Sequence, residues 1–465
     1  MQAHHSLSGW MFLLGYGLTA GAAALHALLT KPDPRSALSW MAVCCSLPYA
    51  GALLYWLLGV NRVHRRSSFV QRRPPGMPAI GAGAVQWSEL APQVRIGDAL
   101  TQRPLTKGNR IEPLHNGEAA FPQMLQAITA ARNTVWLATY IFQTDSVGCK
   151  FSDALTQAVR RGLQVRVLVD GIGEWYDWPH VVPILRRSGV RTERFLPPRI
   201  FPPNLALNCR NHRKVLVLDG DLAFIGGMNL GDREVGGSTG RRMTDIHFRL
   251  HGPVVNQLAA SFAEDWGFAS GETLELTAEP PLEGESVCRV ITGGPDADVD
   301  KLLLILLSAL AGARHCVQIM TPYFVPPLEL VAALEAAALR GIEVSIVLPR
   351  RSNLRYIDWA TLHWIPALIE RGVRVHLQEP PFSHAKLLVV DGRYAHIGSV
   401  NVDTRSLRLN FEIAVEVYDS QFCGTLSGFI ASHERATPAL PQGRYGDRLP
   451  ARIRNALCWL VSPYL

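Results

Sequence analysis

The stretch N-H-R-K-V-L-V-L-D-G (residues 211–220) returns in the second half of the chain as S-H-A-K-L-L-V-V-D-G (residues 383–392). Both copies read His-x-Lys-x-x-x-x-Asp-Gly, and both continue through an apolar run and a glycine-containing turn to an asparagine. The residues of the first copy are His212, Lys214, Asp219 and Asn229, and those of the second are His384, Lys386, Asp391 and Asn401. Two full copies with the same downstream spacing indicate a duplicated functional element.

Each copy predicts a β-hairpin. Asp-Gly between two apolar runs is a strong signal for a tight turn, and residues two apart in a strand face the same side. We therefore expect His212 and Lys214 to project together, with Asn229 brought back beside them by the returning strand. The same holds for His384, Lys386 and Asn401. An inward lysine is costly unless an anion pairs with it, so each copy predicts a phosphate-binding group of imidazole, ammonium and amide.

The flanking sequence alternates strands and helices in the same order in both halves. Helices are expected at 119–131 and 152–161 in the first half and at 301–313 and 328–339 in the second. Apolar runs such as V-W-L-A-T-Y-I-F and V-Q-I-M-T-P-Y-F lie between them as strands. This alternation predicts an α/β fold with βαβ units and a largely parallel sheet in each half.

The composition limits the partners without choosing one. The chain has 465 residues and a net charge of +7, which indicates an anionic partner, either lipid or nucleic acid. Its eight cysteines are scattered, with no C-x-x-C spacing, and support neither a disulfide framework nor a zinc site.

Two long uncharged apolar runs open the chain, at 6–30 and 36–61, with the short link 31–35 between them. Each exceeds the roughly 20 residues that a helix needs to cross a bilayer, so residues 1–60 are expected to form a two-helix transmembrane hairpin. A signal peptide is the alternative, but the first run lacks a basic start. Five arginines follow within 61–75, which places both ends of the anchor and all that follows in the cytoplasm.

The remaining chain is divided into a basic juxtamembrane segment and linker (61–108), a first α/β domain (109–275) and a second one (276–465). The halves differ in an apolar, proline-rich loop at 195–207, which is read either as a covered surface loop or as a lip that enters the bilayer. The tail at 448–465 predicts a short amphipathic helix, docked on the domain or seated in the membrane.

Two imidazoles and two ammonium groups round one pocket suit a phosphoryl transfer in two steps. One neutral histidine attacks phosphorus and forms a phosphohistidine. The other gives a proton to the departing alcohol and takes one from the incoming alcohol. Lys214, Lys386, Asn229 and Asn401 would hold the non-bridging phosphate oxygens, and no metal or cofactor is expected.

A catalytic histidine also needs an acceptor that orients its other nitrogen. We expect Asp245 to orient His212 and Glu412 to orient His384, because each acid lies on what should be the next strand. Asp219 and Asp391 complete the motif but lie at the far end of the hairpin strand. They are expected to have a structural role at the turn.

The doubled motif resembles the phospholipase D superfamily, and nearly the whole chain resembles its membrane-anchored bacterial cardiolipin synthases. The resemblance rests on the N-terminal apolar runs, N-H-R-K, G-G-M-N-L-G-D, T-P-Y-F-V-P, H-A-K-L-L-V-V-D and G-S-V-N-V-D-T-R-S-L-R-L-N-F-E. Met243 departs from the pattern where a tryptophan is common, and P-F-S precedes the second motif where a Gly-Phe-Leu-like run is usual.

This resemblance implies two phospholipase D-like α/β sandwich domains packed pseudo-symmetrically round one active site at the bacterial inner membrane. It implies a phosphatidyltransferase that joins two phosphatidylglycerols into cardiolipin and releases glycerol. By resemblance, His212 is the preferred nucleophile, although His384 stays open. A phospholipase D hydrolase, or a transphosphatidylase with another alcohol, would use the same residues. A nuclease fits the anchor and the modest charge poorly, so no nucleic acid is expected as partner, and a non-enzymatic scaffold would be expected to have lost a histidine or lysine.

Overall fold

The computed structural model describes residues 2–31, 34–60, 88–198, 209–235, 243–276, 280–295, 298–441 and 448–461. The described residues before 61 form one compact unit, and those from 88 to 197 and from 209 onward form another, the α/β unit. The expected loop at 195–207, the arginine cluster at 61–75 and the end of the tail at 462–465 lie wholly or mostly outside the described residues.

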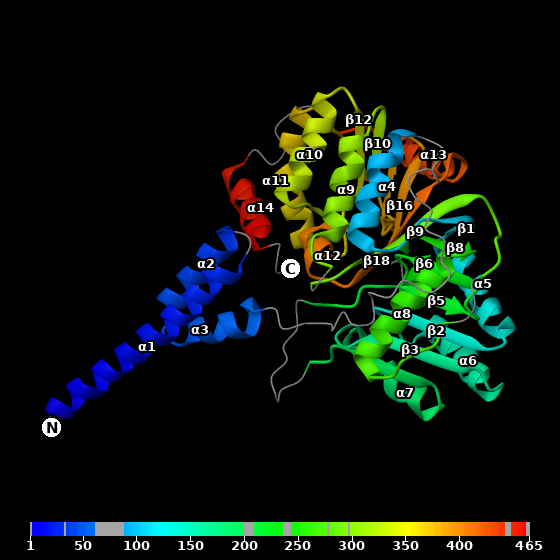
Figure 1. Ribbon diagram of the computed structural model, residues 1–465. Helices are drawn as coiled ribbons and strands as arrows, with labels where there is room; N and C mark the ends of the chain where they lie inside the picture. Colours follow the sequence, from blue (N-terminus) through cyan, green and yellow to red (C-terminus); the bar gives the residue numbers. More distant parts are fainter. Residues whose placement is uncertain are drawn as a thin grey trace. The chain divides into compact units, whose positions relative to one another are not determined.

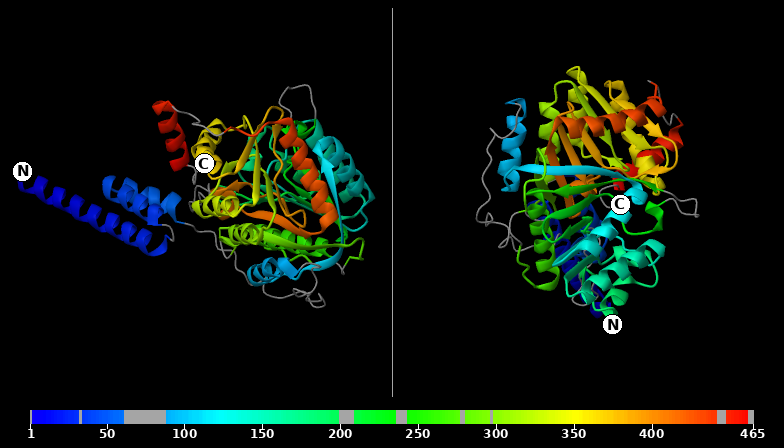
Figure 2. Two further views of the ribbon diagram at one scale, coloured as in Figure 1. Left: turned by 90° about the horizontal axis from the view of Figure 1, so that it is seen from above. Right: turned by 90° about the vertical axis from the view of Figure 1, so that its right-hand side faces the viewer.

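A 14-stranded sheet runs through the α/β unit, with helices on both of its faces (Figures 1 and 2). The strands of the first half are β1 (Thr106–His115), β2 (Thr134–Thr139), β3 (Gln164–Asp170), β4 (Arg191–Phe195), β5 (Val215–Leu218), β6 (Leu222–Gly226) and β8 (Ile246–His251). Those of the second half are β9 (Ser286–Gly293), β10 (Cys316–Met320), β12 (Glu343–Pro349), β13 (Arg374–Gln378), β15 (Leu387–Val390), β16 (Tyr394–Gly398) and β18 (Glu412–Tyr418).

The two halves have matching strand orders that meet in the middle of the sheet. From its edge inward the first half runs β4-β3-β2-β5-β6-β8-β1, and the second runs β13-β12-β10-β15-β16-β18-β9. Strands β1 and β9 pair antiparallel and join the halves into one sheet.

The expectation of a largely parallel sheet is wrong, because the sheet is mixed. Strands β2, β3 and β4 are parallel, as are β10, β12 and β13. The remaining main strands pair antiparallel, since each motif forms a hairpin and the strand after it runs back along that hairpin.

Each half packs three helices on one face of the sheet and one long helix on the other. The helices are α5 (Asn116–Ala130), α6 (Ser146–Arg160), α7 (Val181–Arg187), α8 (Val254–Ser270), α9 (Lys301–Gly312), α10 (Leu328–Leu339), α11 (Arg355–Glu370) and α13 (Ser420–Ala436). The four helices expected from the sequence correspond to α5, α6, α9 and α10. Two apolar clusters, one per half, fill the space between the strands and the face that carries three helices, α5, α6 and α7 in the first half and α9, α10 and α11 in the second.

Part of the segment expected to be a linker is a packed helix. Helix α4 (Ala91–Thr101) lies against α9 of the second half and buries Val94 completely. Its Asp98 forms an ion pair with the buried Arg289 of β9. Helix α4 therefore belongs to the α/β unit.

The N-terminal unit contains α1 (Gln2–Thr30), α2 (Pro34–Ser46) and α3 (Ala50–Leu54), which continues as one π-helical turn, η1 (Tyr55–Gly59). Within α1, residues Gly9–Thr30 are long and apolar enough to cross a membrane. The second apolar run is broken at residues 47–49, where Pro48 has no N–H for a helical hydrogen bond. The second run is therefore divided into shorter helices, and the expected second spanning helix is not confirmed.

The second run also returns to the end of α1 where it began. The break lies beside the first half of α1, because the Tyr49 hydroxyl donates to the Phe12 carbonyl at 2.8 Å. At the far end, the Tyr55 hydroxyl lies 2.7 Å from His26 Nδ1, and Lys31 Nζ donates to the Gly59 carbonyl. Residues 34 and 59 thus lie at the same end of α1.

Candidate active site

The two motif hairpins are confirmed. Strands β5 and β6 pair with Leu218 opposite Leu222, and β15 and β16 pair with Val390 opposite Tyr394. Each histidine and lysine, however, lies just before its strand and not within it, since β5 starts at Val215 and β15 at Leu387.

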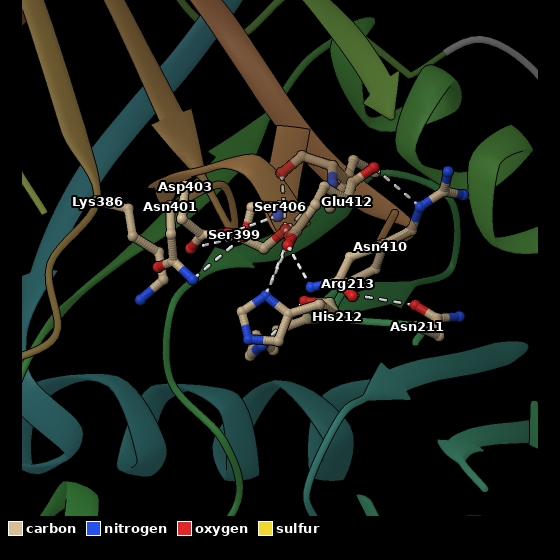
Figure 3. A network of polar contacts seen from close by, with 12 residues as sticks. Asn211, His212, Arg213, Lys386, Ser399, Asn401, Asp403, Ser406, Asn410 and Glu412 are labelled. Carbon is tan, nitrogen blue, oxygen red and sulfur yellow. Dashed lines mark hydrogen bonds and ion pairs between the residues drawn. The ribbon is translucent and has the colours of Figure 1, made fainter. Parts of the chain in front are cut away.

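The orienting acids are exchanged between the halves. His212 Nδ1 lies 3.0 and 3.1 Å from the two carboxylate oxygens of Glu412 (Figure 3), and His384 Nδ1 lies 3.0 Å from Asp245 Oδ2. The predicted pairing of His212 with Asp245 and of His384 with Glu412 is therefore wrong.

The backbone explains this exchange. The His212 N–H donates to the carbonyl of Phe411, the residue before Glu412, at 2.9 Å. The His384 N–H donates to the carbonyl of Thr244, the residue before Asp245, at 2.7 Å. Asp245 lies just before β8, and Glu412 is the first residue of β18. Within each half, the returning strand, β6 or β16, separates β8 or β18 from the motif strand. Each histidine therefore meets the acid of the other half.

Each acid is held by its own set of contacts. Glu412 is fully buried and accepts hydrogen bonds from the Ser399 hydroxyl and, at 3.4 Å, from Asn410 Nδ2. Asp245 Oδ1 accepts the Ile246 N–H at 2.7 Å. A Cβ on Gly227 would lie 2.3 Å from the Asp245 carboxylate, so glycine is required there to let the acid approach.

Burial keeps both imidazoles neutral at neutral pH. It lowers the pKa of His212 to about 4, although Glu412 acts in the opposite direction, and it lowers the pKa of His384 to about 3. The pKa of Glu412 lies below its usual value, because His212, Lys214 and Ser399 outweigh the effect of burial. Each histidine therefore donates its Nδ1 proton to a carboxylate and keeps a lone pair on Nε2.

The two lysines repeat the same geometry. Lys214 Nζ donates to the carbonyl of His212 at 2.9 Å, and Lys386 Nζ donates to that of His384 at 2.5 Å. Burial lowers the pKa of Lys214 to about 7 and also lowers that of Lys386. Each ammonium group lowers the pKa of the other half's histidine as well as its own, which indicates that the halves form one electrostatic site.

The asparagines and motif aspartates are less alike than their sequence suggests. Asn229 Oδ1 accepts the Ile141 N–H at 3.2 Å, whereas Asn401 Nδ2 lies 3.3 Å from Ser406 Oγ (Figure 3). Asp219 and Asp391 do not reach the histidines. Asp219 accepts the N–H groups of residues 132, 133 and 134, and Asp391 accepts those of 314, 315 and 316, at 2.7–2.9 Å. These contacts agree with the structural role expected of both aspartates, which stays a prediction.

Two tyrosines next to the histidines were missed by the sequence analysis. The Tyr140 ring contacts His212 edge-on at a centroid distance of 5.4 Å, and the Tyr323 ring contacts His384 in the same way at 6.0 Å. A signal was present, since each tyrosine closely follows a strand and a threonine, in A-T-Y-I and M-T-P-Y. Burial raises the pKa of both hydroxyls, so both stay protonated.

A third carboxyl group, Glu234, also lies in the site. Its Oε1 accepts the Asn229 N–H at 3.1 Å, and the side chain is buried. Burial, with the nearby Asp245, raises its pKa to about 8, so the group is mostly protonated at pH 7. The second copy has no acid at this spacing, which is why the repeat gave no signal for it.

Comparison with known proteins places this site in a family. The family model described as "Cardiolipin synthase, PLD-like domain" matches residues 124–266 and 306–432, which together make up more than half of the chain. Cardiolipin synthase A of Pseudomonas aeruginosa is 32% identical over 474 residues, covering 98% of this chain and 96% of that protein. The major cardiolipin synthase ClsA of Bacillus subtilis is 30% identical, covering 99% of this chain and 100% of that protein.

Among solved structures, phosphatidylserine synthase from Haemophilus influenzae has the same fold. It superposes with a TM-score of 0.62 at 16% identity, covering 80% of this chain and all of that one. Because the family model covers both motif hairpins and the relatives match over nearly the whole chain, the chain belongs to the family of cardiolipin synthases with PLD-like domains.

Proposed function

We propose that this chain is a cardiolipin synthase that transfers a phosphatidyl group from one phosphatidylglycerol to the glycerol hydroxyl of another. The observation that carries the proposal is the pair of neutral imidazoles, each oriented by a carboxylate of the other half, with two lysines beside them. The curated relatives carry the name of this activity over nearly the whole chain.

In the first step, Nε2 of one histidine attacks the phosphorus of phosphatidylglycerol. A phosphorus–nitrogen bond forms, and the bond from phosphorus to the glycerol oxygen breaks. The second histidine, protonated at Nε2, gives its proton to that oxygen, so glycerol leaves neutral. Glu412 and Asp245 stabilise whichever imidazole is charged.

In the second step, a glycerol hydroxyl of another phosphatidylglycerol gives its proton to the second histidine and attacks phosphorus. The phosphorus–nitrogen bond breaks, which releases cardiolipin and restores the nucleophile. Lys214 and Lys386 offset the charge on the non-bridging oxygens, and the anionic phosphate in turn raises the histidine pKa, which supplies the imidazolium. We assign the nucleophile to His212. That the reaction needs no metal or cofactor stays a prediction.

Water must be kept from competing with the lipid hydroxyl. The aromatic contacts of Tyr140 and Tyr323 cover one side of each imidazole. Only 12% of the His212 side chain and 5% of the His384 side chain are exposed, which favours transfer over hydrolysis.

We further propose that the enzyme is anchored in the bacterial inner membrane through α1, with the α/β unit on the cytoplasmic side where the arginine cluster follows. In the two-span hairpin expected from the sequence, α2 and α3 together cross the membrane and end on the side opposite to the link 31–35. The contact between Lys31 and Gly59 instead favours a second run that enters the membrane beside α1 and returns. The matching strand orders support pseudo-symmetric halves at 109–275 and 276–465.

The proposal is tested with the full chain and phosphatidylglycerol in detergent micelles, with lipids analysed by mass spectrometry and glycerol measured separately. We expect cardiolipin and glycerol in equal amounts. His212→Ala and His384→Ala should each lose at least ~10³-fold in rate, because removing one member of a catalytic unit costs about as much as removing the whole unit. His315→Ala, an exposed histidine outside the site, is the matched control.

Near-normal turnover in either motif variant would contradict the two-histidine mechanism. Phosphatidic acid in place of cardiolipin would identify a hydrolase. A phosphatidyl label trapped on His384 would reverse the assignment of the nucleophile.

A further inference from the structure

Helix α14 (Leu449–Val461) carries an apolar face that remains exposed. Leu449, Ile453, Leu457 and Leu460 are 66%, 50%, 58% and 65% exposed. At roughly 100° per residue, these four side chains form one stripe along the helix. The opposite side packs on α11 (Figure 1). There the Trp459 ring stacks on His363 at 4.5 Å, and Asn455 is buried. The helix is thus docked on the domain and still presents four large apolar side chains to the outside.

Arginines flank this stripe. Arg452 and Arg454 lie about 100° to either side of its centre, and Arg448 precedes the helix; all three are exposed. Arg454 lies over the Trp359 ring at 4.6 Å, while no acidic residue lies within Leu449–Val461. A helix with an apolar stripe bordered by cations matches a bilayer interface with negatively charged headgroups.

A second apolar surface lies on the first half, at the turn after β3. Trp175, Tyr176 and Trp178 are 60%, 62% and 80% exposed. Isolated exposed aromatics are common, but three within four positions form a patch. Tryptophan and tyrosine favour the membrane–water interface, because each ring has an apolar body and a polar group.

Both surfaces are connected to the active site, one through aromatic contacts and the other through an apolar cluster. Tyr176 lies 6.0 Å from Tyr140, which contacts His212. On the other side, Trp459 packs in a small apolar cluster with Tyr323, which contacts His384. Each apolar surface is therefore linked to one of the two motif histidines.

We propose that the α14 stripe and the aromatics at 175–178 rest together on a bilayer containing anionic phospholipid, and hold the two histidines at its headgroup layer. The inference rests on the proposed function, because the phosphodiester of a phospholipid lies at this depth while its acyl chains stay in the membrane. In this proposal the surface acts in addition to the anchor α1.

Photo-crosslinking of the full chain in vesicles of phosphatidylglycerol and phosphatidylcholine tests the proposal. A benzophenone amino acid replaces Leu457 or Trp178, and Leu339 serves as control. Leu339 is 67% exposed but lies before β12, at the end of the sheet opposite to the site. We expect phospholipid adducts at 457 and 178 in several-fold higher yield than at 339. Equal yields, or adducts at 457 with residues 2–60 or a second copy, would overturn the proposal.

A kinetic comparison separates the docking surface from the catalytic function. Ile453→Asp with Leu457→Asp should lower kcat/KM on vesicles about tenfold, since two apolar side chains lose their burial in lipid. Activity in micelles should stay within about twofold of wild type, and Leu339→Asp should change neither. An unchanged rate on vesicles contradicts the docking role. If the wild-type chain makes no cardiolipin in micelles, the proposed function fails instead, and the adducts still decide the docking role.

Discussion

The two motif histidines are neutral because burial, and not their acid partners, dominates their ionisation. A free imidazole would be half protonated near pH 6.5, whereas the pKa of His212 is about 4. The first reaction step can therefore use a neutral nucleophile at any physiological pH. The step's proton must come from the imidazolium that forms once the anionic substrate is bound.

This ionisation predicts the pH dependence of kcat/KM, which reports the free enzyme. The acid limb should lie near pH 4, because His212 becomes protonated and loses its lone pair below that value. On the alkaline side the rate should decline with pH, because the proton of the second imidazolium has to be taken up from solvent. The alkaline limb becomes steeper near pH 7, where Lys214 loses its charge and holds phosphate less well. Initial rates on micellar phosphatidylglycerol from pH 3.5 to about 10 would measure both limbs, since lysine titrates near pH 10.4 when unperturbed.

Lys214→Arg provides the control for this profile. Its maximum should fall because the geometry changes, but the steeper part of its alkaline limb should move up by more than two pH units, since guanidinium stays protonated. A steeper part that still begins near pH 7 in this variant would assign it to another group, such as Lys386.

At this scale the sequence predicted the reacting groups but not their neighbours. His212, Lys214 and their counterparts were found because the same short pattern occurs twice. The exchange of Asp245 and Glu412 could not be found, because it depends on backbone contacts between residues about 140 to 200 positions apart. Glu234 has no counterpart in the repeat, and Tyr140 lies in an apolar run that reads as core.

The motif aspartates act at the level of the hairpin, where they stabilise its turn. Asp219 and Gly220 both have positive φ, at 51° and 78°, and the carboxylate closes the turn that connects α5 to β2. Asp391 and Gly392 repeat this arrangement, with φ of 52° and 60°. One residue therefore supports the turn of the hairpin and the start of the neighbouring strand.

Asp219→Ala should lower the free energy of unfolding by about 1–2 kcal/mol, because three backbone N–H groups lose a charged acceptor. The loss is limited because two of these groups can form hydrogen bonds with water instead. Activity per folded molecule should hardly change, since the carboxylate does not reach the histidines. Thermal melting and rates at 20 °C below the midpoint would measure the two effects. Asp153→Ala, on the exposed side of α6, is the control. Loss of activity without loss of stability would return Asp219 to the reaction.

Element types were predicted better than their arrangement. The four helices and both hairpins follow from local patterns, whereas the mixed sheet depends on which strand lies beside which. The second apolar run passes any test of composition, and a single proline at position 48 divides it.

At the scale of the whole molecule, the returning second run decides on which side of the membrane each terminus lies. If α1 crosses once and α2 and α3 return, the N-terminus is periplasmic and the α/β unit is cytoplasmic. An epitope at the N-terminus should then be reached by antibody in intact spheroplasts, and one at the C-terminus only after lysis. Protection of both epitopes until lysis would restore the two-span hairpin.

The shared carboxylates have a consequence for inheritance. Each half carries a complete motif, yet its histidine depends on an acid of the other half. Substitutions in one half are therefore constrained by the sequence of the other. Selection acts on a substitution near Glu412 through its effect on His212, and on one near Asp245 through its effect on His384. Recombination that joins the first half of one relative to the second half of another would therefore separate two partnerships at once, even where every motif residue is retained.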